Sequence, residues 1–148
     1  MAAKQKEPAE EYVAEAGRLL GFAAGDLVTA RSNHAHTAVP NRNAAYMAQR
    51  AAEKALRAVI LLENRPFDMI HDIDVLAGVV PSDFVVPVPT ADLSWLADVE
   101  SSARYPDEGE TITTADAEQA IEIADRIVSA SSRHFLARGV PVGAFAVL

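Results

Sequence analysis

The stretch Ala44–Leu62 reads AAYMAQRAAEKALRAVILL, and it decides the fold of the chain. Small and apolar residues recur in it at the spacing of one helical face, at Met47, Ala51, Ala55, Ala58 and Leu62. Side chains as short as alanine let a second helix approach closely, because the distance between packed helices depends on the side chains at the contact. The stretch therefore predicts the central helix of a helical bundle.

Charged side chains fall on the opposite side of the same predicted helix. Glu53 and Arg57 have the i,i+4 spacing of a favourable ion pair. Arg50, Lys54 and Arg57 recur at i, i+4 and i+7, and such a basic strip could neutralise a phosphate group. A solvated helix face is the commoner explanation of the same residues, and the sequence leaves both interpretations open.

The length and composition of the chain indicate one helical domain. Its 148 residues are enough for a single core, so we expect one domain over residues 1–148. Half of the residues are hydrophobic and only 6% are aromatic, which suits helices packed through Ala, Leu, Val and Ile. The net charge of −8 argues against a broad nucleic-acid-binding surface, although a small basic pocket remains compatible with it.

Several common functional signals do not occur in the sequence. There is no cysteine, and there is no glycine-rich phosphate loop, GxSxG or HExxH motif. The N-terminal residues lack the apolar core of a signal peptide, and no stretch reaches the ~20 apolar residues of a membrane span. We expect a cytoplasmic protein that does not associate with membranes and needs no metal or cofactor.

A first predicted helix precedes the central one and is separated from it by a loop. Residues 1–7 are polar and are expected to be disordered, and apolar spacing predicts a long first helix over residues 8–30. Residues 34–43, HAHTAVPNRN, have the composition of a loop. Asn41 or Asn43 is suited to cap the central helix.

Prolines and polar residues also divide the second half of the chain. A third, shorter helix is predicted over residues 69–80. The three prolines of residues 81–90 cannot continue a helix, so we expect an extended linker inside the domain. Thr90 or Asp92 then caps a fourth helix, with Leu93, Leu96, Val99 and Ala103 facing inward.

The fifth predicted helix begins at a capping box formed by Thr113 and Asp116. The residues on its inward face share apolar character and helical spacing; they are Ala117, Ile121, Ala124 and Val128. Together, the five predicted helices indicate an all-α fold, with the helices in a mostly up-and-down bundle.

Four short motifs follow one another along the chain. They are AQRAAEKALRAVIL at 48–61, HDIDVL at 71–76, SARYP at 102–106 and DAEQAIEIADRI at 116–127. In this order they resemble the HEPN family (higher eukaryotes and prokaryotes nucleotide-binding domain), over about residues 24–130. The resemblance implies a HEPN-type bundle and a non-catalytic module, which binds a nucleotide or RNA-related ligand or acts as the partner of a minimal nucleotidyltransferase.

We also expect a homodimer. The alanine-rich helix and the apolar tail over residues 140–148 exceed what one small bundle hides easily. Members of the family that the chain resembles commonly pair. A scaffold whose dimer surface is its whole purpose is a plainer alternative.

Two dipeptides are the main candidates for ligand binding. His71 at a helix start could hydrogen-bond a phosphate or a base, and Asp72 suits the positive helix end; the alternative is a capping pair. Arg104 offers a planar fork for phosphate and Tyr105 a ring for stacking; the alternative is an ordinary helix end. We expect both pairs to meet at one patch. The candidate ligand-binding residues are Arg50, Lys54, His71, Asp72, Arg104 and Tyr105.

An endoribonuclease is the alternative function that the resemblance raises. Ribonucleases of the family carry an arginine and a histidine separated by four to six residues, as phosphorane-stabilising group and general base. That spacing occurs at Arg31 with His36 and at Arg65 with His71, while Arg126 and His134 are too far apart. The first match lies at the end of the first predicted helix and the second at the start of the third, and neither is in the late-helix context where the active motif is expected. We therefore predict no catalytic residues; a metal-independent toxin–antitoxin or defence ribonuclease would use Arg65 and His71.

Histidines and carboxylates also raise the question of a metal site. The order His36, His71, Asp72 and Asp125 is shared with helical metal phosphohydrolases. It needs only common residues, and the rest of the chain does not resemble those enzymes. We expect no metal site.

Overall fold

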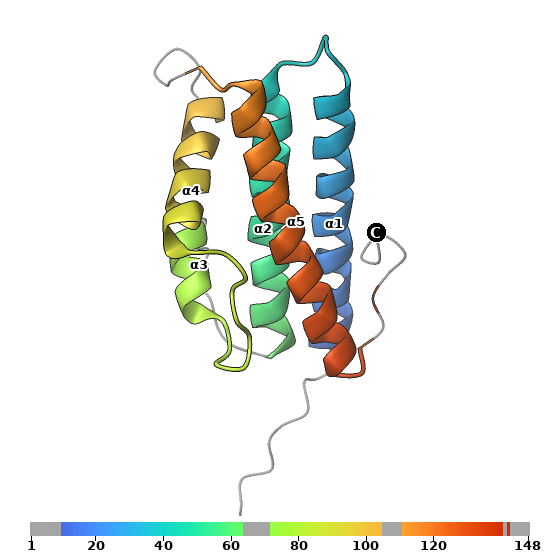
Figure 1. The fold of residues 1–148 in the computed structure, drawn as a ribbon. Coiled ribbons are helices and arrows are strands. Elements are labelled where there is room, and N and C mark those ends of the chain that lie inside the picture. Colours follow the sequence, from blue (N-terminus) through green and yellow to red (C-terminus); the bar gives the residue numbers. More distant parts are fainter. Residues whose placement is uncertain (1–9, 64–71, 105–110, 141, 143–148) are drawn as a thin grey trace, which may run out of the picture.

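The computed structural model describes residues 10–63, 72–104, 111–140 and 142, and these residues form a bundle of α-helices without a strand (Figure 1). The helices are α1 (Glu10–Ala35), α2 (Asn41–Leu62), α3 (Ile73–Val79), α4 (Thr90–Arg104) and α5 (Thr114–Ala137). α2 contacts each of the other four helices. α1 and α5 pack along it, and α3 and α4 lie on its other side (Figure 1). The predicted all-α, five-helix bundle is confirmed.

The alanines of α2 explain its central position. All seven are fully buried: Ala44, Ala45, Ala48, Ala51, Ala52, Ala55 and Ala58. On the facing helix, Ala16, Leu20 and Ala23 are equally buried, so that small side chains line both sides of the α1–α2 contact. Close packing of this kind removes apolar surface from water and is the main stabilising term of the fold.

The solvated-face interpretation of the charged residues of α2 does not hold. Glu53 is only 4% exposed, although its expected ion pair with Arg57 forms, with 3.0 Å between Oε1 and Nη2. Lys54 faces α1, where its Nζ lies 2.5 Å from Asp26 Oδ2. Because α2 is covered on all sides by other helices, its charged residues need partners inside the bundle.

The first connection is shorter than predicted. α1 continues to Ala35, so His34 belongs to the helix and the loop spans only residues 36–40. Pro40 occupies the N-cap position of α2 and no side chain caps this helix, so the predicted asparagine cap is wrong. Asn41 Nδ2 instead donates a hydrogen bond to Thr114 Oγ1 at the start of α5, over 3.2 Å.

The third and fourth helices also begin at other residues than predicted. α3 begins at Ile73 and ends at Val79, and the predicted start at residue 69 lies outside the described residues. Residues 81–89 form the expected non-helical linker. The linker is anchored by Phe84 and Val88, which are 7% and 8% exposed.

α4 begins at Thr90, so neither of the two predicted cap residues precedes the helix. The backbone N–H groups of Asp92 and Leu93 both donate to the Pro89 carbonyl, over 3.0 and 3.4 Å. Thr90 and Asp92 therefore lie inside the helix, and their prediction as caps is wrong. Leu93, Leu96 and Val99 are buried as predicted, whereas Ala103 is only partly buried.

The predicted capping box at the start of α5 is confirmed. Asp116 N–H donates to Thr113 Oγ1 over 3.1 Å, and Thr113 N–H donates to Asp116 Oδ2 over 2.9 Å. Two backbone donors that have no partner inside the helix are thereby satisfied. The inward face is as predicted except for Ile121, which is half-buried.

Glu63, just after α2, joins three segments at the end of the bundle. Its Oε1 lies 3.1 Å from His134 Nε2 and 2.8 Å from Arg138 Nε. Arg138 also forms an ion pair with Asp83 of the linker. The ring of Phe84 meets that of His134 edge-on, with centroids 5.4 Å apart. We call these five residues the Glu63 cluster.

Candidate functional site

A cavity of about 420 Å³ lies between α2, α3 and α4, and it contains two of the predicted ligand-binding residues. Arg50 reaches it from α2 and Asp72 from the start of α3. We call it the α2–α3–α4 cavity. It is lined by Gln49, Arg50, Glu53, Asp72, Ile73, Asp74, Ser94, Ala97, Asp98 and Glu100.

The other predicted ligand-binding residues are not placed in this cavity. Lys54 is paired with Asp26 of α1, so Arg50 and Lys54 have different surroundings although they are neighbours on α2. His71, Tyr105 and the side chain of Arg104 lie outside the described residues. The cavity brings the start of α3 next to α4 between Ser94 and Glu100. The expected meeting of both dipeptides remains a prediction.

Acidic side chains dominate the lining of the α2–α3–α4 cavity. Five carboxylates face one guanidinium there, that of Arg50. Asp72 is exposed and acts as the N-cap of α3, where its Oδ1 accepts the Asp74 N–H over 3.0 Å. The structural interpretation of Asp72 as a capping residue is thereby confirmed. Arg50 is half-buried and forms no ion pair or hydrogen bond with the described residues.

The floor of the cavity is polar although it is buried. Gln49 is 3% exposed, and its Nε2 donates to Glu53 Oε2 over 3.4 Å. Gln49 Oε1 has no hydrogen-bond partner in the described part of the chain. On the wall above, Asp74 Oδ2 accepts from Ser94 Oγ over 3.3 Å, while the buried Asp74 Oδ1 has no partner among the same residues. Two acceptor atoms are thus left without donors.

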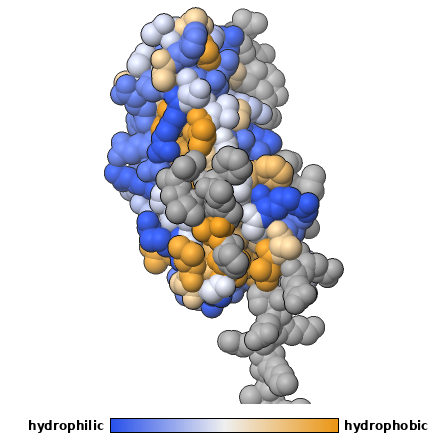
Figure 2. Space-filling view, turned by 90° about the vertical axis from the view of Figure 1, so that its right-hand side faces the viewer, coloured by the Kyte–Doolittle hydropathy of each residue, from blue (hydrophilic) through white to orange (hydrophobic). Residues whose placement is uncertain are grey.

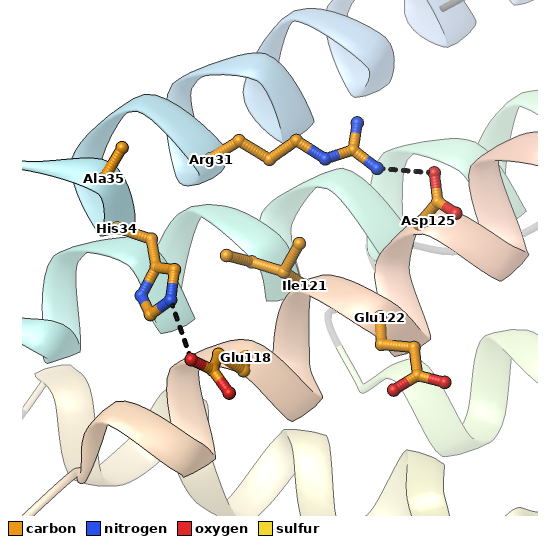
Figure 3. Close-up of a pocket in the computed structure, with 7 residues that line it drawn as sticks. All are labelled: Arg31, His34, Ala35, Glu118, Ile121, Glu122 and Asp125. Carbon is orange, nitrogen blue, oxygen red and sulfur yellow. Dashed lines mark hydrogen bonds and ion pairs between the residues drawn. The ribbon is translucent and has the colours of Figure 1, made fainter.

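A second cavity, of about 350 Å³, lies between α1 and α5, and we call it the α1–α5 cavity. Arg31 Nη2 lies 2.8 Å from Asp125 Oδ1, and His34 Nε2 lies 3.4 Å from Glu118 Oε1. Figure 3 shows these two pairs reaching across from α1 to α5, with Ile121 between them. Each basic group in this cavity has an acidic partner, which leaves little positive charge for a phosphate.

The arginine–histidine spacings considered for ribonuclease activity do not converge in the described structure. Arg31 lines the α1–α5 cavity, whereas His36 follows α1, is exposed and does not line it. Arg126 pairs with Glu122 over 2.6 Å, and His134 belongs to the Glu63 cluster at the far end of α5. Arg65 and His71 lie outside the described residues. No group of three metal-ligating side chains forms among the residues that the structure describes.

The sequence did not single out Gln49, Asp74, Ser94, Asp98 and Glu100 as cavity residues. One signal pointed toward the first of them. Gln49 and Glu53 are polar residues one turn apart inside a run of alanines, and polar side chains in such a run need partners or a function when buried. The others are ordinary helix residues, which only the packing of α3 and α4 on α2 brings together.

The five-helix arrangement and its cavities define a small all-α module built around one alanine-rich helix. A model of the HEPN domain matches residues 16–134, and the chain belongs to the HEPN domain family. The chain is also similar to TT1696 from Thermus thermophilus, known from a crystal structure. The two are 24% identical with a TM-score of 0.53, over 86% of this chain and 98% of that one, which supports the fold. No curated protein matches the chain. None of the described helices is long and apolar enough to cross a membrane.

Proposed function

We propose that the chain is a non-catalytic HEPN module of the cytoplasm, which recognises a partner protein through the α2–α3–α4 cavity. The partner that the family resemblance supports is a minimal nucleotidyltransferase. One observation carries the proposal: the α2–α3–α4 cavity is lined by five carboxylates and one guanidinium, and in the α1–α5 cavity Arg31 and His34 are each paired with a carboxylate. An acidic lining repels the phosphates of RNA and favours a protein surface.

Co-purification with the nucleotidyltransferase encoded nearest to this chain tests the proposal. We expect the two proteins, expressed together, to elute as one complex whose mass equals that of both components. The purified chain should leave RNA intact. Elution as separate proteins would contradict the proposal that the chain binds a nucleotidyltransferase. Cleavage of RNA that disappears in the variant His71→Ala would establish the endoribonuclease alternative.

A nucleotide is the second candidate ligand, which Arg50 favours and the five carboxylates of the same cavity disfavour. Its half-buried guanidinium has no partner in the described part of the chain and could contact a phosphate. Calorimetric titration with nucleotides, alone and in the presence of the partner, tests this candidate. Binding that is lost in Arg50→Ala and kept in Arg126→Ala, an exposed arginine on α5, would support it.

We further propose that the chain forms a homodimer through α1. Phe22 is 58% exposed and Val28 is 42% exposed. On the face where α1 lies, Figure 2 shows hydrophobic residues mainly in the lower half, below a more hydrophilic upper half. A Cβ atom built at Gly17, Gly21 or Gly25 would meet no atom within 4 Å. This glycine stripe leaves room for a helix of a second copy to approach α1 closely.

Replacing Phe22 by glutamate is expected to convert the dimer into a monomer. A charge buried in an apolar contact costs several kcal/mol, of order the energy that holds such a small interface together. Light scattering during gel filtration at micromolar concentration gives the mass. The matched control is Val85→Glu, which introduces the same charge at a linker residue that is 80% exposed. A wild-type mass equal to one chain would contradict the proposal.

A further inference from the structure

Gln49 brings to the α2–α3–α4 cavity a hydrogen-bond acceptor that has no donor among the described residues. Gln49 lines the cavity and is only 3% exposed. Its amide nitrogen points to the Glu53 carboxylate, at 3.4 Å, which fixes its carbonyl oxygen on the other side. The reverse orientation would place that oxygen against a carboxylate, which is unfavourable. Gln49 Oε1 therefore needs a donor that the described residues do not supply.

The walls of the same cavity add negative charge. Asp74 comes from α3, and Asp98 and Glu100 come from α4. The buried Asp74 Oδ1 also has no hydrogen-bond partner in the described part of the chain. Carboxylates and a carbonyl oxygen accept hydrogen bonds and donate none. The Gln49 and Asp74 oxygens need a hydrogen-bond donor, and next to the Asp74 and Asp98 carboxylates a positively charged donor is favoured over a neutral one.

We propose that the α2–α3–α4 cavity binds an ammonium or a guanidinium group. Such cations offer three or five donors, whereas the described residues provide no cluster that could hold a metal ion. A volume of about 420 Å³ is within the range of small-ligand sites. The cation is either a basic side chain of the partner or a free amine. The assignment of the cation to a partner protein rests on the proposed function. The binding of a cation in the cavity rests only on Gln49 and the carboxylates.

Calorimetric titration of the full chain with agmatine and spermidine, at about 0.15 M salt, tests the inference. We expect saturable binding of at least one of the two. The double variant Asp74→Asn, Asp98→Asn keeps the shape of the site and removes two charges, and its affinity should fall at least about tenfold. The control Glu118→Gln, Glu122→Gln removes two charges on α5 and should bind as the wild type does. Equal affinity of the cavity variant and the wild type would overturn the inference.

The variant Gln49→Leu separates a binding role from a structural one. Leucine is close to glutamine in size, but the variant also removes the hydrogen bond that Gln49 Nε2 donates to Glu53 Oε2 over 3.4 Å, so we expect a modest fall in the melting temperature. A binding role predicts in addition that the affinity for agmatine or spermidine falls. A lower melting temperature with unchanged binding would show that Gln49 serves the fold alone and would remove it from the site.

The partner complex distinguishes the two sources of the cation. If the partner supplies a basic side chain, agmatine should compete with complex formation and the Asp74→Asn, Asp98→Asn variant should weaken it. Binding of agmatine or spermidine with an unaffected complex assigns the site to a free amine. A wild-type chain that forms no complex refutes the proposed function, while the titration still decides the cation site. The inference fails if neither amine binds and the complex tolerates the cavity variant.

Discussion

Replacing Arg57 by methionine is expected to lower the free energy of unfolding by about 3 kcal/mol, the lower end of the range for a broken buried pair, because Gln49 also donates to Glu53. The side chains of Glu53 and Arg57 are 5% and 19% exposed, so the variant leaves a buried carboxylate without its 3.0 Å ion pair. Removing one partner of a buried pair costs much more than the pair itself contributes, because the remaining charge stays out of water. Urea denaturation of both proteins measures the difference.

The control for this prediction has the same spacing on the surface. Glu122 and Arg126 also stand at i,i+4, but their side chains are 64% and 54% exposed. Arg126→Met should cost less than about 1 kcal/mol, because water solvates the carboxylate that remains. The double variant Glu53→Gln, Arg57→Met should recover part of the stability lost by Arg57→Met. Equal losses in Arg57→Met and Arg126→Met would show that burial of the first pair does not determine its role.

Replacing Phe135 by alanine is also expected to have a large effect, lowering the free energy of unfolding by about 3–5 kcal/mol. Phe135 is fully buried near the end of α5, and its ring is among the largest side chains of the core. Truncation removes its burial and leaves a cavity that the surrounding helices fill only in part. Thermal and urea denaturation should both show the loss.

Leu136, the next residue, provides the matched control. It is 58% exposed, and Leu136→Ala should change the free energy of unfolding by less than about 0.5 kcal/mol. The two variants differ by one position on the same helical turn, so their contrast reports burial and excludes a general effect on helix propensity. A small loss in Phe135→Ala would mean that the end of α5 packs less tightly than described.

The sequence was most informative where local rules decide the structure. The alanine spacing of α2 and the Thr113–Asp116 capping box depend on neighbouring residues, and both were predicted correctly. It was less informative where distant segments meet. Asn41 was predicted as a cap, but its amide donates to Thr114, which is 73 residues away. Glu53 was placed with Arg57 on the side opposite the alanine face, and their i,i+4 spacing does not reveal that other helices cover the pair.

The candidate site was predictable in part for the same reason. Arg50 and Asp72 were recognised from their chemistry and their places on helices, and both line the α2–α3–α4 cavity. Asp74 and Asp98 are ordinary acidic helix residues in the sequence, and only the packing of α3 and α4 on α2 makes them neighbours. Lys54 was grouped with Arg50 by helical spacing, but α1 supplies Asp26 as its partner.

The Glu63 cluster has a consequence for how the molecule opens. The ion pair between Glu63 and Arg138 connects the end of α2 to the end of α5. The ion pair between Arg138 and Asp83 connects the linker after α3 to the same point. Separation of α3 and the linker from the bundle therefore has to break these ion pairs, each of which contributes at most about 1 kcal/mol because the side chains of Arg138 and Asp83 are 41% and 55% exposed. We expect α3 to open together with the end of α5 and not before it.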